Sequence, residues 1–201
     1  MESTPLTTLP IQALIDEFKT FDSETFAEQV TALVRETEVD FESLAPYVHY
    51  LDNGYTRNLI YKDERVEVLA LCWRPGNASS IHNHRDQQCW MLVPKGKLLN
   101  QNYLVHDRDP AKGTCRLEES SSLLITAEAP MAVDPEEPVH QVRNLREFGS
   151  DAVSLHIYSN PFDTCEVYCP DKGIYRDVKL SYWSKHGVLV GTQQSDPCAD
   201  N

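Results

Sequence analysis

The chain has 201 residues, of which 41% are hydrophobic and 24% are charged, close to the composition of a globular domain. Its 18 basic and 31 acidic residues give a formal net charge of -13, which argues against a nucleic-acid partner because such a surface repels phosphate backbones. No apolar run approaches the roughly 18 residues of a membrane span, and residues 1–10 carry no leader pattern. We therefore expect one cytoplasmic domain with no membrane partner. The oligomeric state cannot be read from these features, and a monomer is the default.

The first 52 residues predict a helical section. Thr25 and Glu28 have the pattern of a capping box, a short helix is expected over residues 40–49, and the turn signal Asn53-Gly54 ends the section. Apolar residues recur at helical spacing in two groups, Ile11, Leu14, Ile15 and Phe18, then Phe26, Val30, Leu33 and Val34.

Short apolar or alternating runs of strand length follow. They cover residues 66–73, 89–93, 98–105, 123–127, 139–145, 152–158, 165–168 and 178–183. Turn residues separate several of them, at the spacing typical of a β-sandwich or barrel. We expect a mainly β fold, with residues 1–52 packed on a β-barrel of residues 53–192 and a frayed polar tail of residues 193–201.

The cysteines lie at irregular spacing and predict free thiols. They are Cys72, Cys89, Cys115, Cys165, Cys169 and Cys198. A chain of this size needs no disulfides to stabilise its core, and a reducing compartment keeps thiols free. Cys165 and Cys169 form a C-x3-C pair without a second pair or a downstream histidine pair, so we interpret both as ordinary thiols and not as zinc ligands.

A His-x-His pair is the most informative local pattern. On a strand, residues two apart point to the same face, so His82 and His84 can offer two imidazoles to one ion. Such a pair needs a third ligand, and His140 is the best-placed candidate if a barrel brings a later strand alongside. An isolated pair of this kind is more often exposed or packed than metal-binding, so the wider pattern decides.

That wider pattern resembles the two metal-binding motifs of the cupin superfamily. The first motif reads G-x5-H-x-H-x4-C-x6-G from Gly76 to Gly96, and the second reads P-x-E-x2-H-x3-N from Pro135 to Asn144. Cys89 stands where most cupins have a glutamate, and Glu137 replaces a glycine. The resemblance implies a cupin-type β-barrel, also called a double-stranded β-helix or jelly roll.

Further motifs narrow the resemblance to the cysteine dioxygenase type I family. Tyr55-Thr-Arg57-Asn58 precedes the first motif, and Ser154-Leu-His156-Ile-Tyr158-Ser159 follows the second. Together with the cysteine at position 89, these motifs occur in that family in the same order. The similarity extends from about residue 52 to residue 187.

The resemblance implies a set of site residues and one iron(II) ion per chain. His82, His84 and His140 would bind the iron, and Arg57 would bind a substrate carboxylate, for which its planar guanidinium is suited. Ser154, His156 and Tyr158 would form an active-site hydrogen-bond chain, since all three point the same way on a strand. Tyr55 and Trp73 are expected to line the pocket wall.

Two family features concern Tyr158 and its neighbours. Some members join a cysteine at the Cys89 position to the tyrosine ring by a thioether, and this chain has both halves of that link. Many members have a proline after the serine, in a cis peptide bond, where this chain has Asn160. Because a cis bond before a non-proline residue costs roughly 2.5 to 4 kcal/mol, we expect a trans bond here.

The implied activity is oxidation of L-cysteine with O2 to cysteine sulfinic acid. One alternative is a dioxygenase for 3-mercaptopropionate or another small thiol, although members with that preference tend to lack the residues found here at positions 57 and 89. A second is a cupin that binds a metal or ligand without turnover. A third is a manganese or zinc cupin enzyme, which usually keeps the glutamate. Zinc and nickel also suit three imidazoles, so iron rests on the resemblance.

Overall fold

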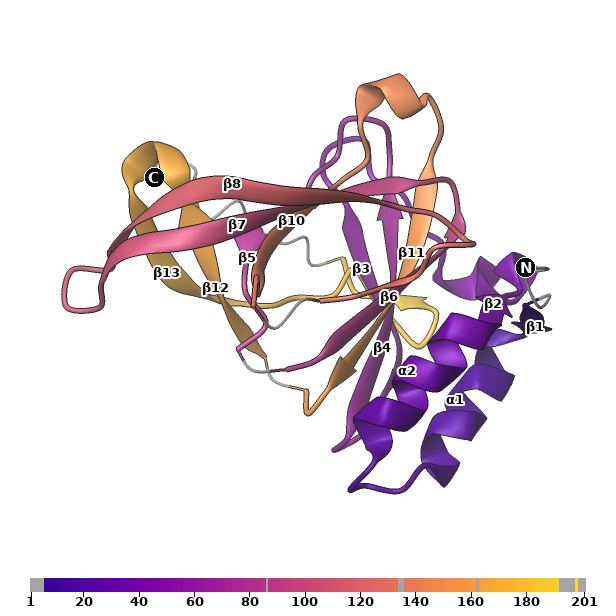
Figure 1. Cartoon of the computed structure of the whole chain (residues 1–201). Coiled ribbons are helices and arrows are strands. Elements are labelled where there is room, and N and C mark those ends of the chain that lie inside the picture. Colours follow the sequence, from indigo (N-terminus) through magenta and orange to yellow (C-terminus); the bar gives the residue numbers. More distant parts are fainter. Residues whose placement is uncertain (1–5, 86, 134–135, 162, 192–197, 199–201) are drawn as a thin grey trace, which may run out of the picture.

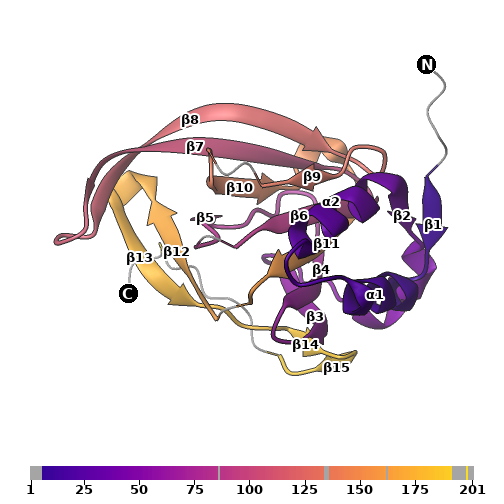
Figure 2. The same ribbon diagram turned by 60° about the horizontal axis from the view of Figure 1, so that its bottom comes forward.

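The computed structural model describes residues 6–85, 87–133, 136–161, 163–191 and 198. Two β-sheets make up the body, and the helices α1 and α2 lie at the opposite end of the molecule from the hairpin of strands β12 and β13 in both views (Figures 1 and 2). The fold is mainly β with N-terminal helices, as predicted. No helix in the described part of the chain is long and apolar enough to cross a membrane.

The first sheet has seven strands in the order β15-β14-β3-β4-β11-β6-β9. Its strands are β3 (Thr56–Lys62), β4 (Val66–Trp73), β6 (Cys89–Lys95), β9 (Met131–Ala132), β11 (Ala152–Ser159), β14 (Ser184–Lys185) and β15 (Val188–Leu189). Every residue of β4 and β11 is buried, because one face of these central strands packs on the helices and the other faces the second sheet.

The pairings of the second sheet close on themselves in the order β10-β5-β12-β13-β8-β7. Its strands are β5 (Ile81–His82), β7 (Leu98–Asp109), β8 (Thr114–Ile125), β10 (Val139–Arg143), β12 (Thr164–Cys169) and β13 (Ile174–Lys179). Strands β7 and β8 form a long hairpin that arches over this side of the barrel (Figure 2). The run expected at residues 123–127 begins inside the end of β8.

The two predicted helices form at α1 (Ile11–Thr20) and α2 (Phe26–Glu36). Their apolar faces join the core under β4 and β11, and Leu14, Phe18 and Val30 are fully buried. The capping box expected at the start of α2 is wrong. Its N-cap Thr25 makes no side-chain capping bond; the Thr25 hydroxyl donates to Gln29 Oε1 at 3.3 Å, and the same oxygen accepts from the Asp22 backbone N–H at 2.9 Å.

Other local expectations differ from the structure. The segment expected as a third helix is a 3-10 helix, η1 (Phe41–Tyr47), with Pro46 inside it. Two unexpected three-residue strands, β1 (Thr7–Leu9) and β2 (Thr37–Val39), pair in parallel within the helical section. Short 3-10 turns also occur at η2 (Arg146–Phe148) and η3 (Pro170–Lys172). Segments this short carry too few residues to show a periodicity.

The strand expected at residues 178–183 is misplaced. Strand β13 ends at Lys179, and the chain then leaves the second sheet to pair as β14, in parallel, with β3 of the first sheet. The run of alternating residues therefore spans a crossing between sheets. Strand β3, which carries Arg57, was not among the expected strands.

The backbone geometry explains why the first motif has glycine at position 96. It turns the chain from β6 to β7 with a left-handed backbone φ of 75°, and a Cβ atom there would approach the carbonyl oxygen of Asp151 to 2.8 Å. Only glycine fits both the φ angle and the close approach. The motif glycine thus lets β7 start close to β11.

The expectation of six free thiols is wrong for one pair. Cys169, at the end of β12, forms a disulfide with Cys198, and their Cα atoms lie 5.5 Å apart. The two residues are 29 positions apart, so no local pattern indicates the pairing. The free cysteines are Cys72, Cys89, Cys115 and Cys165. Apart from Cys198, the tail expected to be frayed lies outside the described residues.

Candidate metal centre

Three histidines from two backbone segments converge inside the barrel. His82 ends β5, His84 follows it outside any strand, and His140 lies on β10, where it pairs directly with His82. The ligand atoms of all three lie within 4.8 Å of one another. Among the described residues this cluster contains histidines only, with no carboxylate or thiolate.

Hydrogen bonds fix the tautomers of two of these rings. His82 Nδ1 lies 2.9 Å from the Ser80 carbonyl oxygen, and His140 Nδ1 lies 2.5 Å from Asn100 Oδ1. Both partners only accept, so each Nδ1 carries the proton and each Nε2 presents a lone pair. The lone pairs of His82 and His140 both face the third histidine of the cluster.

The spacing of the Nε2 atoms fits a shared metal ion. His84 Nε2 lies 3.2 Å from His82 Nε2 and 3.2 Å from His140 Nε2. One ring proton on His84 could serve only one of these neighbours. Two imidazole nitrogens each about 2.1 Å from one divalent ion would lie roughly 3.0–3.4 Å apart. The donor set therefore fits a single cation with further positions open.

Burial keeps these imidazoles neutral, which is the form that binds metals. It lowers the pKa of His82 to about 4. For His84 and His140, burial and the neighbouring histidines hold the pKa well below its usual value. The three rings thus need not lose a proton when they bind a cation near neutral pH.

A cavity opens beside the triad and contains a buried arginine. The cavity spans about 580 Å³, including its open mouth, and its lining includes Arg57, His82, His84 and Tyr158. Arg57 is only 7% exposed, and its Nε has no hydrogen-bond partner among the described residues. Burial would lower the pKa of Arg57, but Tyr158 and Tyr55 raise it, so the guanidinium stays charged. An unsatisfied buried guanidinium is suited to binding an anion.

The two aromatic residues expected on the pocket wall occupy different positions. The rings of Tyr55 and Trp73 stack with centroids 4.5 Å apart. Tyr55 lines the cavity, whereas Trp73 is fully buried and is not among the lining residues. Trp73 therefore supports the wall and does not form it.

A hydrogen-bond chain runs along one face of β11. Trp73 Nε1 donates to Ser154 Oγ at 2.9 Å, Ser154 Oγ lies 2.9 Å from His156 Nε2, and His156 Nδ1 lies 3.1 Å from the Tyr158 hydroxyl. Since the Trp73 N–H can only donate, the chain is satisfied if Ser154 donates to Nε2 and Nδ1 donates to the tyrosine oxygen. The phenol hydrogen of Tyr158 is then free to point into the cavity.

Tyr158 lies between two side chains on the neighbouring strands. Cys89 of β6 is its direct partner on one side, and Glu67 of β4 is its direct partner on the other. Cys89 is 1% exposed, and burial raises the pKa of its thiol. A thiol held neutral opposite a phenol ring is not a metal ligand here, in agreement with its absence from the cluster.

Glu67 lines the cavity and was not predicted from the sequence. It is 3% exposed, accepts a hydrogen bond from the Tyr182 hydroxyl and lies 3.2 Å from Lys62 Nζ. The sequence does contain a signal for Glu67. This residue is in phase with Leu69, Leu71 and Trp73, which lie on the inward face of an otherwise apolar strand. A charge in that phase indicates a functional or paired carboxylate.

His156 gives the metal-free protein a specific pH dependence. Burial, with Arg57 and His82, lowers its pKa from 6.5 to about 3. As the pH falls, protons therefore bind to His156 in the unfolded chain before they bind to it in the folded protein. The contribution of His156 to the free energy of unfolding is fully present above pH 6.5 and is lost as the pH falls toward 3. We expect this loss to be about 1.4 kcal/mol per pH unit.

Urea unfolding of the metal-free protein between about pH 6 and about pH 4 measures this slope, because in that range His156 is protonated in the unfolded chain and neutral in the folded protein. His156→Gln, which cannot titrate, should show a slope shallower by about 1.4 kcal/mol per pH unit. Equal slopes for the two proteins would mean that folding does not lower the pKa of His156. The other buried histidines are common to both proteins and cancel in the comparison.

Comparisons with known proteins agree with one another at the sequence level. The model of the cysteine dioxygenase type I family matches residues 1–171. Cysteine dioxygenase type 1 of Homo sapiens is 28% identical over 179 residues, 89% of this chain and 87% of the human protein. The Bos taurus enzyme is 29% identical over 175 residues, 87% of this chain and 85% of that protein.

Among solved structures, a Klebsiella pneumoniae protein with a double-stranded β-helix domain has a TM-score of 0.43 at 15% identity, covering 58% of this chain and 81% of that one. A cupin superfamily protein from Desulfitobacterium hafniense has a TM-score of 0.41 at 11% identity, covering 57% of this chain and 84% of that one.

Proposed function

Because the chain belongs to the cysteine dioxygenase type I family, we propose that it oxidises L-cysteine with dioxygen to cysteine sulfinic acid at one iron(II) ion. The observation that carries the proposal is a cavity lined by a buried, charged arginine and by His82 and His84, two members of the cluster of three neutral histidines. The triad offers metal ligands, and the arginine offers a partner for an amino-acid carboxylate. No other described cavity combines the two.

His82, His84 and His140 would hold the iron through their Nε2 atoms. Because all three are neutral, the site keeps the full charge of the cation and favours an anionic ligand such as a thiolate. When bound, iron(II) supplies the redox chemistry by which both atoms of dioxygen reach the substrate sulfur. The same donor set also suits zinc or nickel, so the choice of iron rests on the family.

Arg57 would grip the substrate carboxylate and orient the thiol toward the triad. Its Nε lacks a partner among the described residues, and a carboxylate would supply one. A charge-assisted hydrogen bond of this kind contributes about 1.5 to 3 kcal/mol. Arg57 is only 7% exposed, so solvent screens this interaction less than it would at the surface.

The overall reaction balances without a further reductant. The thiol R–SH and one O2 give the sulfinic acid R–SO2H, and the sulfur loses the four electrons that reduce dioxygen. The chain therefore needs no second cofactor for this step. Its residues position the two substrates and hold protons.

Tyr158 is the proton-holding group nearest the triad in this scheme. Its ring lies edge-on to His84, with centroids 5.4 Å apart. Burial and the neighbouring Cys89 keep its pKa well above the usual value, so the phenol remains a hydrogen-bond donor throughout the working pH range. Ser154 and His156 hold this phenol in place as positioning residues.

We further propose that Cys89 and Tyr158 form a thioether during turnover. The direct pairing of Cys89 with Tyr158 across the β6–β11 ladder supports this link. The bond forms between Cys89 Sγ and the tyrosine ring, with loss of the S–H and one ring C–H hydrogen, and dioxygen accepts the two electrons and two protons. After repeated turnover, we expect an intact mass lower by two hydrogens.

The matched control for this prediction is Cys72, which is fully buried on the opposite face of β4. The mass loss should persist in Cys72→Ala and disappear in Cys89→Ala. Cys89→Ala should keep part of its activity, because the link is not a metal ligand. An unchanged mass in the wild-type protein after turnover would remove the idea.

A substrate panel tests the proposed function. The protein is loaded anaerobically with iron(II), and oxygen uptake and products are followed with L-cysteine, cysteamine and 3-mercaptopropionate at equal concentrations. We expect one sulfinate per O2 with L-cysteine as the best substrate. Faster turnover of 3-mercaptopropionate would move the assignment to another thiol dioxygenase. Iron binding without uptake of oxygen with any thiol would support a binding module.

The remaining expectations from the sequence complete the proposal. They are a monomer, a cytoplasmic location, and one domain that comprises helical residues 1–52, barrel residues 53–192 and tail residues 193–201. The disulfide of Cys169 removes the free-thiol argument for a reducing compartment. Light scattering and fractionation of the source cells measure the first two.

A further inference from the structure

His84 lies outside the regular structure that holds the other two histidines. Strand β5 contains only Ile81 and His82, and His82 already pairs with His140 on one side and Val167 on the other. Arg85, which follows His84, has a left-handed backbone φ of 45°. With no strand around His84, its position depends on a hydrogen bond from the Gln87 backbone N–H to its carbonyl oxygen at 2.9 Å, on its ring contact with Tyr158, and on the contacts of its two chain neighbours.

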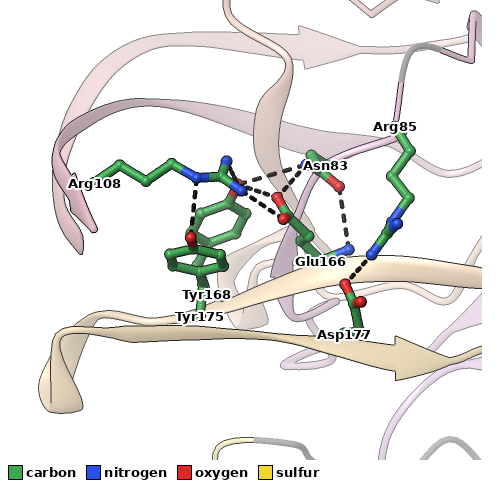
Figure 3. Close-up of polar contacts among 7 residues, drawn as sticks. All are labelled: Asn83, Arg85, Arg108, Glu166, Tyr168, Tyr175 and Asp177. Carbon is green, nitrogen blue, oxygen red and sulfur yellow. Dashed lines mark hydrogen bonds and ion pairs between the residues drawn. The ribbon is translucent and has the colours of Figure 1, made fainter. Parts of the chain in front are cut away.

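Asn83, the residue between the two histidines, is clamped to Glu166 of β12 (Figure 3). Asn83 Nδ2 donates to Glu166 Oε2 at 2.7 Å, and the Glu166 backbone N–H donates to Asn83 Oδ1 at 3.1 Å. The Asn83 backbone N–H also donates to the Glu166 carbonyl oxygen at 3.1 Å. Because Oδ1 accepts from a backbone N–H, the amide has one orientation, and its Nδ2 faces the carboxylate.

Glu166 is itself held by the far end of the β7–β8 hairpin. Arg108 Nη2 donates to Glu166 Oε1 at 2.6 Å, and the Tyr168 hydroxyl donates to Oε2 at 2.9 Å. Arg108 Nε donates to the Tyr175 hydroxyl at 3.1 Å, and its guanidinium stacks 4.3 Å from the centre of that ring. Burial would raise the pKa of Glu166, but the bonds from Arg108 and Tyr168 outweigh it, so the carboxylate stays charged.

Arg85, on the other side of His84, is held by the hairpin of β12 and β13, which also carries Glu166. Arg85 forms an ion pair with Asp177 of β13, and Figure 3 shows both Asn83 and Arg85 directed toward that hairpin. Side chains on both sides of His84 are thus tied to acidic residues of one hairpin, Asn83 to Glu166 and Arg85 to Asp177. Asn83 makes the larger number of bonds, and its partner is the better buried acid.

We propose that Glu166 is a positioning residue of the metal centre: it holds Asn83 so that His82 and His84 both face His140, and Arg108 holds Glu166. The inference rests on the proposed function, because it assigns these residues to the iron site of that function. Glu166 touches no ligand atom and no substrate, and it acts through the backbone between two ligands. Metal affinity is sensitive to such outer contacts, whose loss typically costs about 10- to 100-fold.

Single substitutions test the clamp through iron affinity and not through activity alone. Glu166→Gln keeps the shape but has one acceptor oxygen, so it cannot accept from both Arg108 and Asn83. Asn83→Asp places two carboxylates against each other. We expect each to weaken iron(II) binding by about 10- to 100-fold, measured anaerobically by competition with a chromophoric chelator.

The double variant Asn83→Asp with Glu166→Gln reverses the donor and acceptor. The glutamine oxygen then accepts from Arg108, and its amide nitrogen donates to Asp at position 83. We expect the double variant to recover about tenfold in iron affinity over either single variant. A residue needed only for folding would show no such recovery, because the effects of the two single substitutions on iron affinity would add.

Arg108 has a matched control on the same hairpin. Arg116 forms ion pairs with Asp107 and Glu118 at 3.2 Å and 3.6 Å and does not contact Glu166. Arg108→Gln should weaken iron(II) binding, and Arg116→Gln should leave it unchanged. Circular dichroism of each metal-free variant, at the temperature of the titration, shows that every protein measured is folded.

The outcomes separate this inference from the proposed function. If the wild-type protein binds no iron or oxidises no thiol, the proposed function fails first. If the wild-type protein binds iron and turns over, but Glu166→Gln and Asn83→Asp bind iron as tightly, the positioning role is wrong. Weakened single variants without recovery in the double variant would also overturn it.

Discussion

His140→Ala should abolish iron binding and thiol oxidation together while leaving a folded protein. His140 provides one of three neutral nitrogens, and no other residue of β10 has an imidazole, thiol or carboxylate that could replace its Nε2. Losing a direct ligand should cost more than the about 10- to 100-fold typical of an outer contact. An anaerobic iron titration and an oxygen electrode measure the two effects.

His106 of β7 provides the control for this substitution. It lies 3.2 Å from Glu118 and takes no part in the triad. His106→Ala should bind iron and oxidise cysteine as the wild-type protein does. Iron binding and turnover that survive in His140→Ala would contradict the three-histidine site. His84→Gln gives a second test should the alanine variant not fold.

Arg57→Met should lower the kcat/KM for L-cysteine by about 10- to 150-fold, mainly through KM. This range corresponds to the 1.5 to 3 kcal/mol of a charge-assisted bond, at about 1.4 kcal/mol for each factor of ten. Cysteamine has no carboxylate, so its turnover should change little. The comparison removes any general effect of the substitution on the cavity. Steady-state oxygen uptake with both thiols makes the measurement.

Arg57→Lys separates geometry from charge. Lysine keeps the positive charge but loses the planar fork, so its kcat/KM for L-cysteine should lie between those of the wild-type protein and Arg57→Met. Equal losses for L-cysteine and cysteamine in Arg57→Met would show that the arginine supports the fold instead of binding the carboxylate. Arg57 also interacts electrostatically with Glu67, so removing its charge could disturb the cavity itself. The comparison with cysteamine detects such a disturbance, because it would affect both thiols.

Local periodicity predicted the parts of the site that lie on one strand. Ser154, His156 and Tyr158 alternate along β11, and the structure places them on one face with Trp73 at the start of the chain of hydrogen bonds. The same alternation brings His82 and His84 to one side, although β5 ends at His82. Two-residue periodicity is a property of the extended backbone and needs no tertiary information.

Contacts between distant strands could not be predicted in this way. The prediction that His140 joins His82 rests on the family resemblance, since sequence spacing alone cannot place β10 beside β5. Glu166 and Arg108 lie 58 residues apart, and each looks like a solvated surface charge in the sequence. The pairing depends on the register of the closed sheet, which the sequence pattern leaves open.

The errors have the same origin. The Cys169–Cys198 disulfide and the parallel pairing of β14 with β3 both arise where the chain returns to a distant element. Local rules describe how a segment prefers to fold, and tertiary contacts decide where it stops. The capping box at Thr25 failed for this reason on a small scale, because Gln29 turned back to the preceding loop.

Labelled dioxygen provides the most direct test of the central claim, that this chain adds both oxygen atoms of O2 to the sulfur of L-cysteine. The iron-loaded protein is given L-cysteine under isotopically labelled dioxygen in ordinary water, and the product is analysed by mass spectrometry. The account predicts cysteine sulfinic acid with both sulfinate oxygens labelled, one per O2 consumed. Cystine as the product, or a sulfinate that carries one oxygen from water, would contradict it.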